Sequence, residues 1–169
     1  MQIRPEKSDE IAAVRAVNIA AFATRAEADL VDALRAQANP FISLVAADGG
    51  NGSIVGHICF SPVTLLEFAE LAIVGLAPMA VRPEAQRRGI GLALVHAGLD
   101  HCTQLGCGAV VVLGHPEYYP RFGFVPASRF GIRSEYGVPD EVFMARELEA
   151  GILRGKSGVI RYHAAFANL

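Results

Sequence analysis

The sequence predicts a single-domain α+β fold, with a mixed central sheet of about six to seven strands flanked by helices and one β-α-β crossover. The length of 169 residues suits one domain. Apolar residues make up 52% of the chain and charged residues 19%, which excludes a disordered chain. β-rich runs and helical periodicities alternate without a repeat or a long linker, so we expect one domain over residues 1–169.

The N-terminal part predicts a short strand followed by two helices. Residues 1–5 form the strand candidate. Residues 8–10, Ser-Asp-Glu, offer an oxygen cap and an acidic first turn, and apolar residues then recur at helical spacing over 11–21. A second helical pattern covers residues 27–37, and Asn39-Pro40 ends it.

Three β-rich runs follow. Residues 41–47 and 53–65 flank the glycine-rich turn 48–52, which predicts a hairpin. The long apolar run 71–81 has the length of a central strand. Because Pro78 cannot donate a ladder hydrogen bond, we expect a bulge or a departure from the neighbouring strand there.

The middle of the chain predicts the crossover. One helical face is formed by five apolar residues, Leu94, Val95, Leu99, Cys102 and Leu105. Gly106 stands where a left-handed cap ends such a helix, and residues 109–114 have the β-branched run of a buried parallel strand. Later candidates are a short turn or helix leading into a strand (115–127), a strand (141–149), and a last strand or extended tail (158–166).

The stretch PEAQRRGIGLALV, residues 83–95, predicts an anion site. Arg87 and Arg88 add positive charge, while Gly89 and Gly91 allow a ligand close to the free amides of a helix start. The stretch lacks the Lys-Ser/Thr of a Walker loop. Leu94 stands where a dinucleotide-binding fingerprint needs its third glycine, which disfavours a nucleotide-binding module.

The line GLAPMAVRPEAQRRGIGLALV resembles the acetyl-CoA motif of the GNAT N-acetyltransferase superfamily, Gln/Arg-x-x-Gly-x-Gly/Ala after a central strand. YYPRFGF is similar to the family's second signature, Tyr-x-Lys/Arg-x-Gly-Phe. Together with the closing GVIRYHAAF, these segments resemble the predicted-acetyltransferase subgroup called YhbS-like over nearly the whole chain. The resemblance implies a GNAT-like fold, acetyl-CoA as cosubstrate and no metal.

The same resemblance implies which residues hold the coenzyme. The expected coenzyme-binding residues are Met79, Ala80, Val81, Gln86, Arg87, Arg88, Gly89, Ile90 and Gly91. Backbone amides of residues 86–91 would bind the pyrophosphate. The backbones of Met79 and Val81 would pair with the pantetheine arm, and a backbone N–H there would polarise the thioester carbonyl, with their side chains in the core. The side chain of Arg88 is either a specific ligand or an ordinary solvated charge.

Tyr119 is the candidate catalytic residue. The resemblance places it near the coenzyme sulfur as a general acid, while the competing interpretation is an aromatic corner with Phe122 and Phe124. Tyr118 is the neighbour with which it could be confused, although the spacing to Gly123 favours Tyr119.

No general base stands out. Glu27, Glu67 and Glu70 are candidates, but each is expected to be a solvated surface charge. Four single histidines receive no role: His57, His96, His101 and His163. His115 lies beside the proposed site without matching a catalytic position. Cys59, Cys102 and Cys107 lack metal spacing and are expected to be reduced and buried.

The sequence therefore predicts an N-acyltransferase that acetylates an amine of a small molecule or peptide. A CoA-binding sensor or partner module without turnover is the alternative. A net charge of −2 excludes a general nucleic-acid binder. No membrane span or signal core is visible, so we expect a cytoplasmic protein. A homodimer is compatible with the apolar composition.

Overall fold

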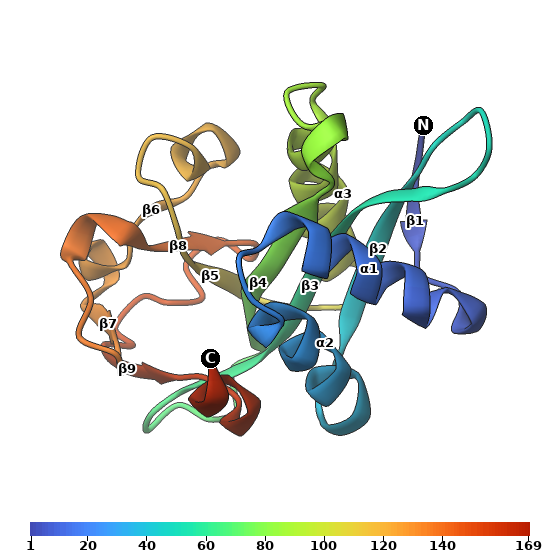
Figure 1. The fold of residues 1–169 in the computed structure, drawn as a ribbon. Helices are drawn as coiled ribbons and strands as arrows, with labels where there is room; N and C mark the ends of the chain where they lie inside the picture. The colour runs from blue at the N-terminus through green and yellow to red at the C-terminus, as the bar shows by residue number, and fades with distance from the viewer. The chain divides into compact units, whose positions relative to one another are not determined.

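The computed structural model describes all 169 residues, in nine strands and three α-helices joined by loops and short 3-10 turns (Figure 1). The α+β class is confirmed. The structure has more strands than the predicted six to seven, because it includes very short ones such as β6 (Val125–Pro126) and β7 (Ile132–Ser134). Two compact units emerge: one comprises residues 1–61, 77–98 and 164–169, and the other comprises 62–76 and 99–163.

The first unit is built on an antiparallel sheet of β1 (Gln2–Pro5), β2 (Ile42–Ala47) and β3 (Ile54–Leu65). In the register of β1 and β2, Gln2 lies opposite Ala47. Strands β2 and β3 form the predicted hairpin, with Ile42 opposite Phe60.

Helices cover both faces of this sheet. α1 (Ile11–Ala21) and α2 (Ala26–Gln37) pack on one face through a buried cluster of Val14, Val17, Val31, Val45, Ala47, Ile54 and Ala80. The first half of α3 (Ile90–Gln104) covers the other face. A Cβ at Gly56 would lie 3.0 Å from Ile90 and Leu94, so the small residue lets this helix approach the sheet closely.

The second unit contains the parallel partner of the crossover. The first residues of β4 (Ile73–Val81) run parallel to β5 (Ala109–Leu113), with Ile73 opposite Ala109. Because α3 joins these two strands, the predicted β-α-β unit is confirmed. β8 (Phe143–Glu147) pairs antiparallel with β5, and β6 pairs with β8.

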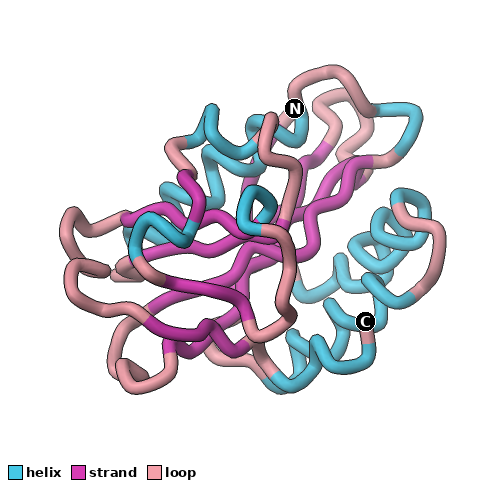
Figure 2. Tube along the Cα trace, turned by 90° about the vertical axis from the view of Figure 1, so that its left-hand side faces the viewer, coloured by secondary structure: helices cyan, strands magenta, loops and turns pink.

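A small second ladder completes this unit. β7 runs parallel to β9 (Gly158–Arg161), and β9 pairs antiparallel with the end of β3. β7 has no counterpart among the predicted strands. The last predicted segment is both a strand and a helical turn, since η6 (Ala164–Asn168) follows β9 and lies beside α2 of the first unit (Figure 1). Figure 2 shows the C-terminus among helical segments.

One predicted core position is wrong. Leu94, Val95, Leu99 and Cys102 are buried as expected, but Leu105 is 57% exposed. It lies beyond the last residue of α3, so the helical spacing no longer aims it at the core. Gly106 has φ +85°, which confirms the predicted left-handed cap.

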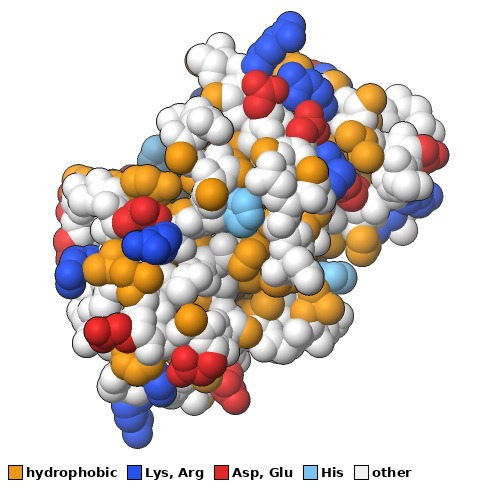
Figure 3. All heavy atoms as spheres, turned by 90° about the horizontal axis from the view of Figure 1, so that it is seen from below, with side chains coloured by type: hydrophobic (Ala, Val, Ile, Leu, Met, Phe, Trp, Pro, Cys, Tyr) orange, Lys and Arg blue, Asp and Glu red, His pale blue; other side chains and the backbone are white.

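The surface carries mixed charges. On the face shown in Figure 3, acidic and basic side chains are interspersed among apolar ones, in line with the net charge of −2. None of the helices has the length and apolarity that a bilayer crossing requires. The three cysteines are free and buried, as predicted, and burial raises the pKa of the Cys59 thiol.

Candidate functional site

The loop between β4 and α3 is held firmly at its start. The Arg82 N–H donates to Val55 O at 2.9 Å, and Arg82 Nε donates to Ile54 O at 3.2 Å. Gln86 Nε2 donates to Val81 O at 3.1 Å. The side chain of Gln86 therefore fastens the loop to the end of β4, which is a role that the motif alone does not reveal.

The loop backbone then takes an alternating conformation. Arg87 has φ +64° and Gly89 has φ +80°, with Arg88 between them outside the left-handed region. Alternating backbone conformations of this kind are typical of anion-binding nests, in which successive N–H groups face a common side. The first amides of α3 adjoin this loop and have no acceptor within the helix. The loop therefore has a backbone conformation that anion-binding sites use, and its role as the anion site stays a prediction.

Arg87 is the unexpected member of this loop. A non-glycine residue at positive φ is uncommon and strained by roughly 1–3 kcal/mol. The folded structure imposes this conformation, because the pinned Gln86 precedes it and the helix start follows it. Strain of this kind gathers at functional sites.

The side chains around the loop differ in exposure. Arg87 and Arg88 are both exposed, and Arg88 lines an open pocket of about 580 Å³ with Arg82 and Glu84. Ala80 is 2% exposed within the core cluster. Met79 and Val81 are only partly buried, so the expectation that their side chains belong to the core is wrong. Their alternation with Ala80 turns them to the opposite face of the strand.

In the second unit, Tyr119 lies in the turn η3 (Tyr119–Phe122) and is 7% exposed. Its ring makes an edge contact with Phe124, at a centroid distance of 5.7 Å. A Cβ at Gly114 would overlap the ring carbons of Tyr119, so glycine is required for this packing. Burial raises the pKa of Tyr119 to about 12. The aromatic corner therefore exists, and its phenol stays protonated at neutral pH.

Tyr118 is the more accessible tyrosine. Its ring stacks under the guanidinium of Arg121, with Cζ 4.7 Å from the ring centroid. It lines an open pocket of about 430 Å³ with His115, Glu117 and Arg121. His115 is exposed, and its carbonyl accepts the Tyr118 N–H at 3.0 Å.

The three candidate bases differ in their burial. Glu67 and Glu70 are exposed in the turn before β4, as expected for surface charges. Glu27 is different, because its Oε1 atom is buried and has no hydrogen-bond partner. Glu27 is only partly buried as a residue, so the expectation of a solvated charge holds for it only in part. Its place on the buried stripe of α2, one turn before Leu30 and Val31, is the sequence signal for this burial.

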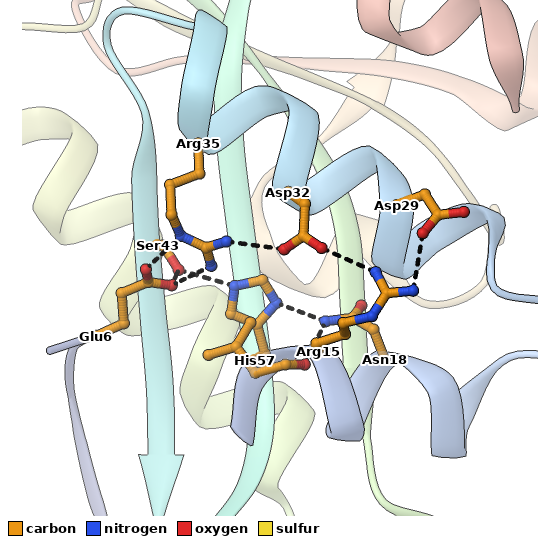
Figure 4. A network of polar contacts seen from close by, with 9 residues as sticks. Glu6, Arg15, Asn18, Asp29, Asp32, Arg35, Ser43 and His57 are labelled. Atoms are coloured by element: carbon orange, nitrogen blue, oxygen red, sulfur yellow. Dashed lines mark hydrogen bonds and ion pairs between the residues drawn. The ribbon is translucent and has the colours of Figure 1, made fainter. Parts of the chain in front are cut away.

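His57 has partners that sequence reasoning missed (Figure 4). It is fully buried on β3, where Ser43 Oγ lies 2.8 Å from its Nε2 and Asn18 Nδ2 lies 3.1 Å from its Nδ1. The Ser43 hydroxyl donates to Glu6, which also accepts two hydrogen bonds from Arg35.

The direction of this chain fixes the state of the imidazole. Because the Ser43 proton points to Glu6, Ser43 Oγ accepts from His57 Nε2–H. His57 Nδ1 is then bare and accepts from Asn18. Burial lowers the pKa of His57 to about 4, so the ring is neutral at physiological pH. The network joins α1, β2 and β3, which makes it a structural tie.

Comparison with known proteins identifies relatives of the whole chain. The sequence pattern of the "Acetyltransferase (GNAT) family" matches residues 11–124. The chain is 35% identical over 166 residues to "Uncharacterized N-acetyltransferase YhbS" of Escherichia coli strain K12, and the match covers 98% of each protein. It is 41% identical over 140 residues to "Uncharacterized N-acetyltransferase YjhQ" of the same strain, over 80% of this chain and 76% of that protein.

Two solved structures share both fold and sequence. The crystal structure of YhbS from Escherichia coli in complex with CoA has a TM-score of 0.91 and 34% identity, covering 98% of this chain and 91% of that chain. A GNAT family acetyltransferase from Brucella melitensis in complex with acetyl-CoA has a TM-score of 0.79 and 35% identity, covering 98% of this chain and 97% of that chain.

Proposed function

Because this chain belongs to the acetyltransferase (GNAT) family, we propose that it transfers an acetyl group from acetyl-CoA to an amine of a small molecule or peptide. The two similar structures were solved with CoA and with acetyl-CoA, which supports the choice of cosubstrate. Both matches cover 98% of the chain, which supports one N-acetyltransferase domain over residues 1–169.

The observation that carries the proposal is the alternating backbone conformation of Arg87 to Gly89 next to the start of α3. A pyrophosphate carries two anionic groups and suits several converging N–H donors better than one side chain. The exposed guanidinium groups of Arg87 and Arg88 add favourable charge on the same loop. Gly89 leaves the backbone open, since a Cβ there would meet no atom within 4 Å.

The preceding strand supplies the second part of the proposal. Met79 and Val81 are partly exposed, so their strand presents one accessible face just before the anion site. The pantetheine arm carries amides that pair with a strand backbone as an added strand would. A strand N–H there polarises the thioester carbonyl as negative charge develops on its oxygen.

Tyr119 is the proposed general acid. A neutral acceptor amine attacks the thioester carbon, the carbon–sulfur bond breaks, and the leaving thiolate takes a proton from the phenol. The proton that the nitrogen loses passes to solvent, from which the phenolate is reprotonated. The raised pKa keeps the phenol proton in place until the thiolate forms. The packing of Tyr119 against Phe124 fits this role as well, because a fixed ring holds its hydroxyl in one position.

The test is the release of free CoA thiol from acetyl-CoA with a panel of amines and peptides. We expect release that depends on an amine and forms an equal amount of acetylated product. Coenzyme binding without any turnover would instead indicate a CoA-binding module. Dephospho-CoA should compete with CoA because the pyrophosphate is the main anchor, while equal competition by NAD would contradict a pantetheine site.

A further inference from the structure

The ladder between β4 and β5 ends before either strand does. Its last pair is Gly75 opposite Val111, although β4 continues to Val81 and β5 continues to Leu113. On its other edge, β5 stays paired with β8 over its whole length. The two parallel strands therefore part after Gly75, toward their carboxyl ends, which is where open α/β sheets bind ligands.

The space over this last pair is filled by the ring of Tyr162. Gly75 has no side chain, and a Cβ there would lie 3.2 Å from the Tyr162 ring and 3.0 Å from Val63. Tyr162 is 8% exposed and directly follows β9, which pairs with the end of β3. The glycine thus lets an aromatic ring approach the backbone of β4 at the place where the strands part.

The surroundings of Tyr162 hold its ring in one position. The Tyr162 N–H donates to Glu135 Oε2 at 2.6 Å, and the ring of Tyr136 lies against that of Tyr162 at a centroid distance of 5.5 Å. Tyr136 is 47% exposed, so Tyr162 is the inner ring of the pair. A ring fixed on several sides sets a firm limit on the size of a group bound beside it.

Tyr119 and Tyr162 approach the parted strands from opposite faces. Because side chains alternate along a strand, Val111 and Leu113 point to one face of β5 and Gly114 turns to the other. The Tyr119 ring packs on Gly114, while the Tyr162 ring packs over the residue paired with Val111. The face of Tyr162 also presents an apolar side chain, since Leu113 is 38% exposed. The two rings therefore have different roles.

We propose that Tyr162 limits the acyl group of the coenzyme to two carbons, which selects acetyl-CoA over thioesters with longer acyl chains. The inference rests on the proposed acetyltransferase function. With the pyrophosphate at the loop after β4 and the pantetheine arm along that strand, the thioester end of the coenzyme lies toward Gly75. A longer acyl chain would meet the closed ladder at Gly75 and the ring of Tyr162 above it.

The closing experiment measures the binding of CoA, acetyl-CoA, propionyl-CoA and butyryl-CoA by calorimetry, without an acceptor. Tyr162→Ala removes the ring, and Tyr162→Leu keeps a smaller apolar side chain in case the alanine variant does not fold. Tyr162→Phe keeps the ring. Tyr136→Ala is the matched control, because it removes the neighbouring ring and leaves Tyr162 over Gly75. Urea unfolding checks each variant, and release of CoA thiol with a panel of amines measures turnover in parallel.

Wild type should bind propionyl-CoA about 10-fold more weakly than acetyl-CoA, and butyryl-CoA more weakly still, because one extra methylene group in a closed pocket is worth about 10- to 200-fold. In Tyr162→Ala, butyryl-CoA should bind at least as tightly as acetyl-CoA, since its additional methylene groups are then buried. Tyr162→Leu should accept propionyl-CoA. Tyr162→Phe and Tyr136→Ala should keep the wild-type order, and CoA, which has no acyl group, should bind all variants alike.

Three results would overturn the inference alone. The first is equal binding of the three thioesters by wild type. The second is wild-type discrimination in both Tyr162→Ala and Tyr162→Leu, and the third is a loss of discrimination in Tyr136→Ala as large as in Tyr162→Ala. If the thioesters are discriminated as expected but no amine gives turnover, the acetyltransferase proposal fails while the size limit holds. If wild type binds no coenzyme, both fail.

Discussion

The substitution Gly89→Val distinguishes the contribution of the anion-binding loop to stability from its contribution to coenzyme binding. Gly89 has φ +80°, and a Cβ there would meet no atom within 4 Å. The substitution therefore strains the backbone without a clash inside the protein. We expect a loss of about 1–3 kcal/mol in the free energy of unfolding. A domain with ordinary stability of about 5–15 kcal/mol stays folded after such a loss.

The effect on the ligand should be larger. The new side chain projects over the nest and keeps a pyrophosphate away from the amides. If two amide–phosphate hydrogen bonds are lost at about 1.5–3 kcal/mol each, the total is about 3–6 kcal/mol. At about 1.4 kcal/mol for each factor of ten, acetyl-CoA should bind about 10²- to 10⁴-fold more weakly. Isothermal titration calorimetry with acetyl-CoA measures this affinity, and urea unfolding measures the stability.

Gly106→Val is the matched control. Gly106 follows the other end of α3, has φ +85°, and likewise leaves a Cβ without a neighbour within 4 Å. The two variants should lose similar stability, while only Gly89→Val loses coenzyme affinity. Affinity within threefold of wild type for a folded Gly89→Val protein would refute the assignment of this loop to the pyrophosphate.

Three further outcomes are expected. Tyr119→Phe should lower kcat by about 10²- to 10⁴-fold with unchanged acetyl-CoA affinity, whereas Tyr118→Phe should change kcat little. If the chemical step limits the rate and kcat of Tyr119→Phe stays within twofold of wild type, Tyr119 is only a packing residue. Burial lowers the pKa of His57 from 6.5 to about 4, so as the pH falls the imidazole is protonated in the unfolded chain before it is protonated in the folded one. The free energy of unfolding should therefore drop by about 3 kcal/mol between pH 6.5 and pH 4. In urea unfolding measured against pH, His57→Gln should remove this drop. Gly98→Ala should destabilise the fold, because overlap with the buried Phe60 ring outweighs the gain of about 1 kcal/mol in helix propensity; a higher midpoint in urea would contradict this.

The sequence determined the features that depend on neighbouring residues. The hairpin of β2 and β3 follows from two β-rich runs around a glycine turn, and the crossover follows from the helical spacing between two apolar runs. The anion-binding loop could be located for the same reason, since glycines at a helix start act on the backbone next to them. Local chemistry also placed the left-handed cap at Gly106.

Only the tertiary structure decided where side chains find partners. One buried carboxylate oxygen of Glu27 has no hydrogen-bond partner, although Asp29 and Asp32 on the same helix are bound by arginines. His57 meets Ser43 and Asn18, which lie 14 and 39 residues away in the chain. No periodicity encodes such contacts, because they arise when separate elements pack and exclude water from the groups between them.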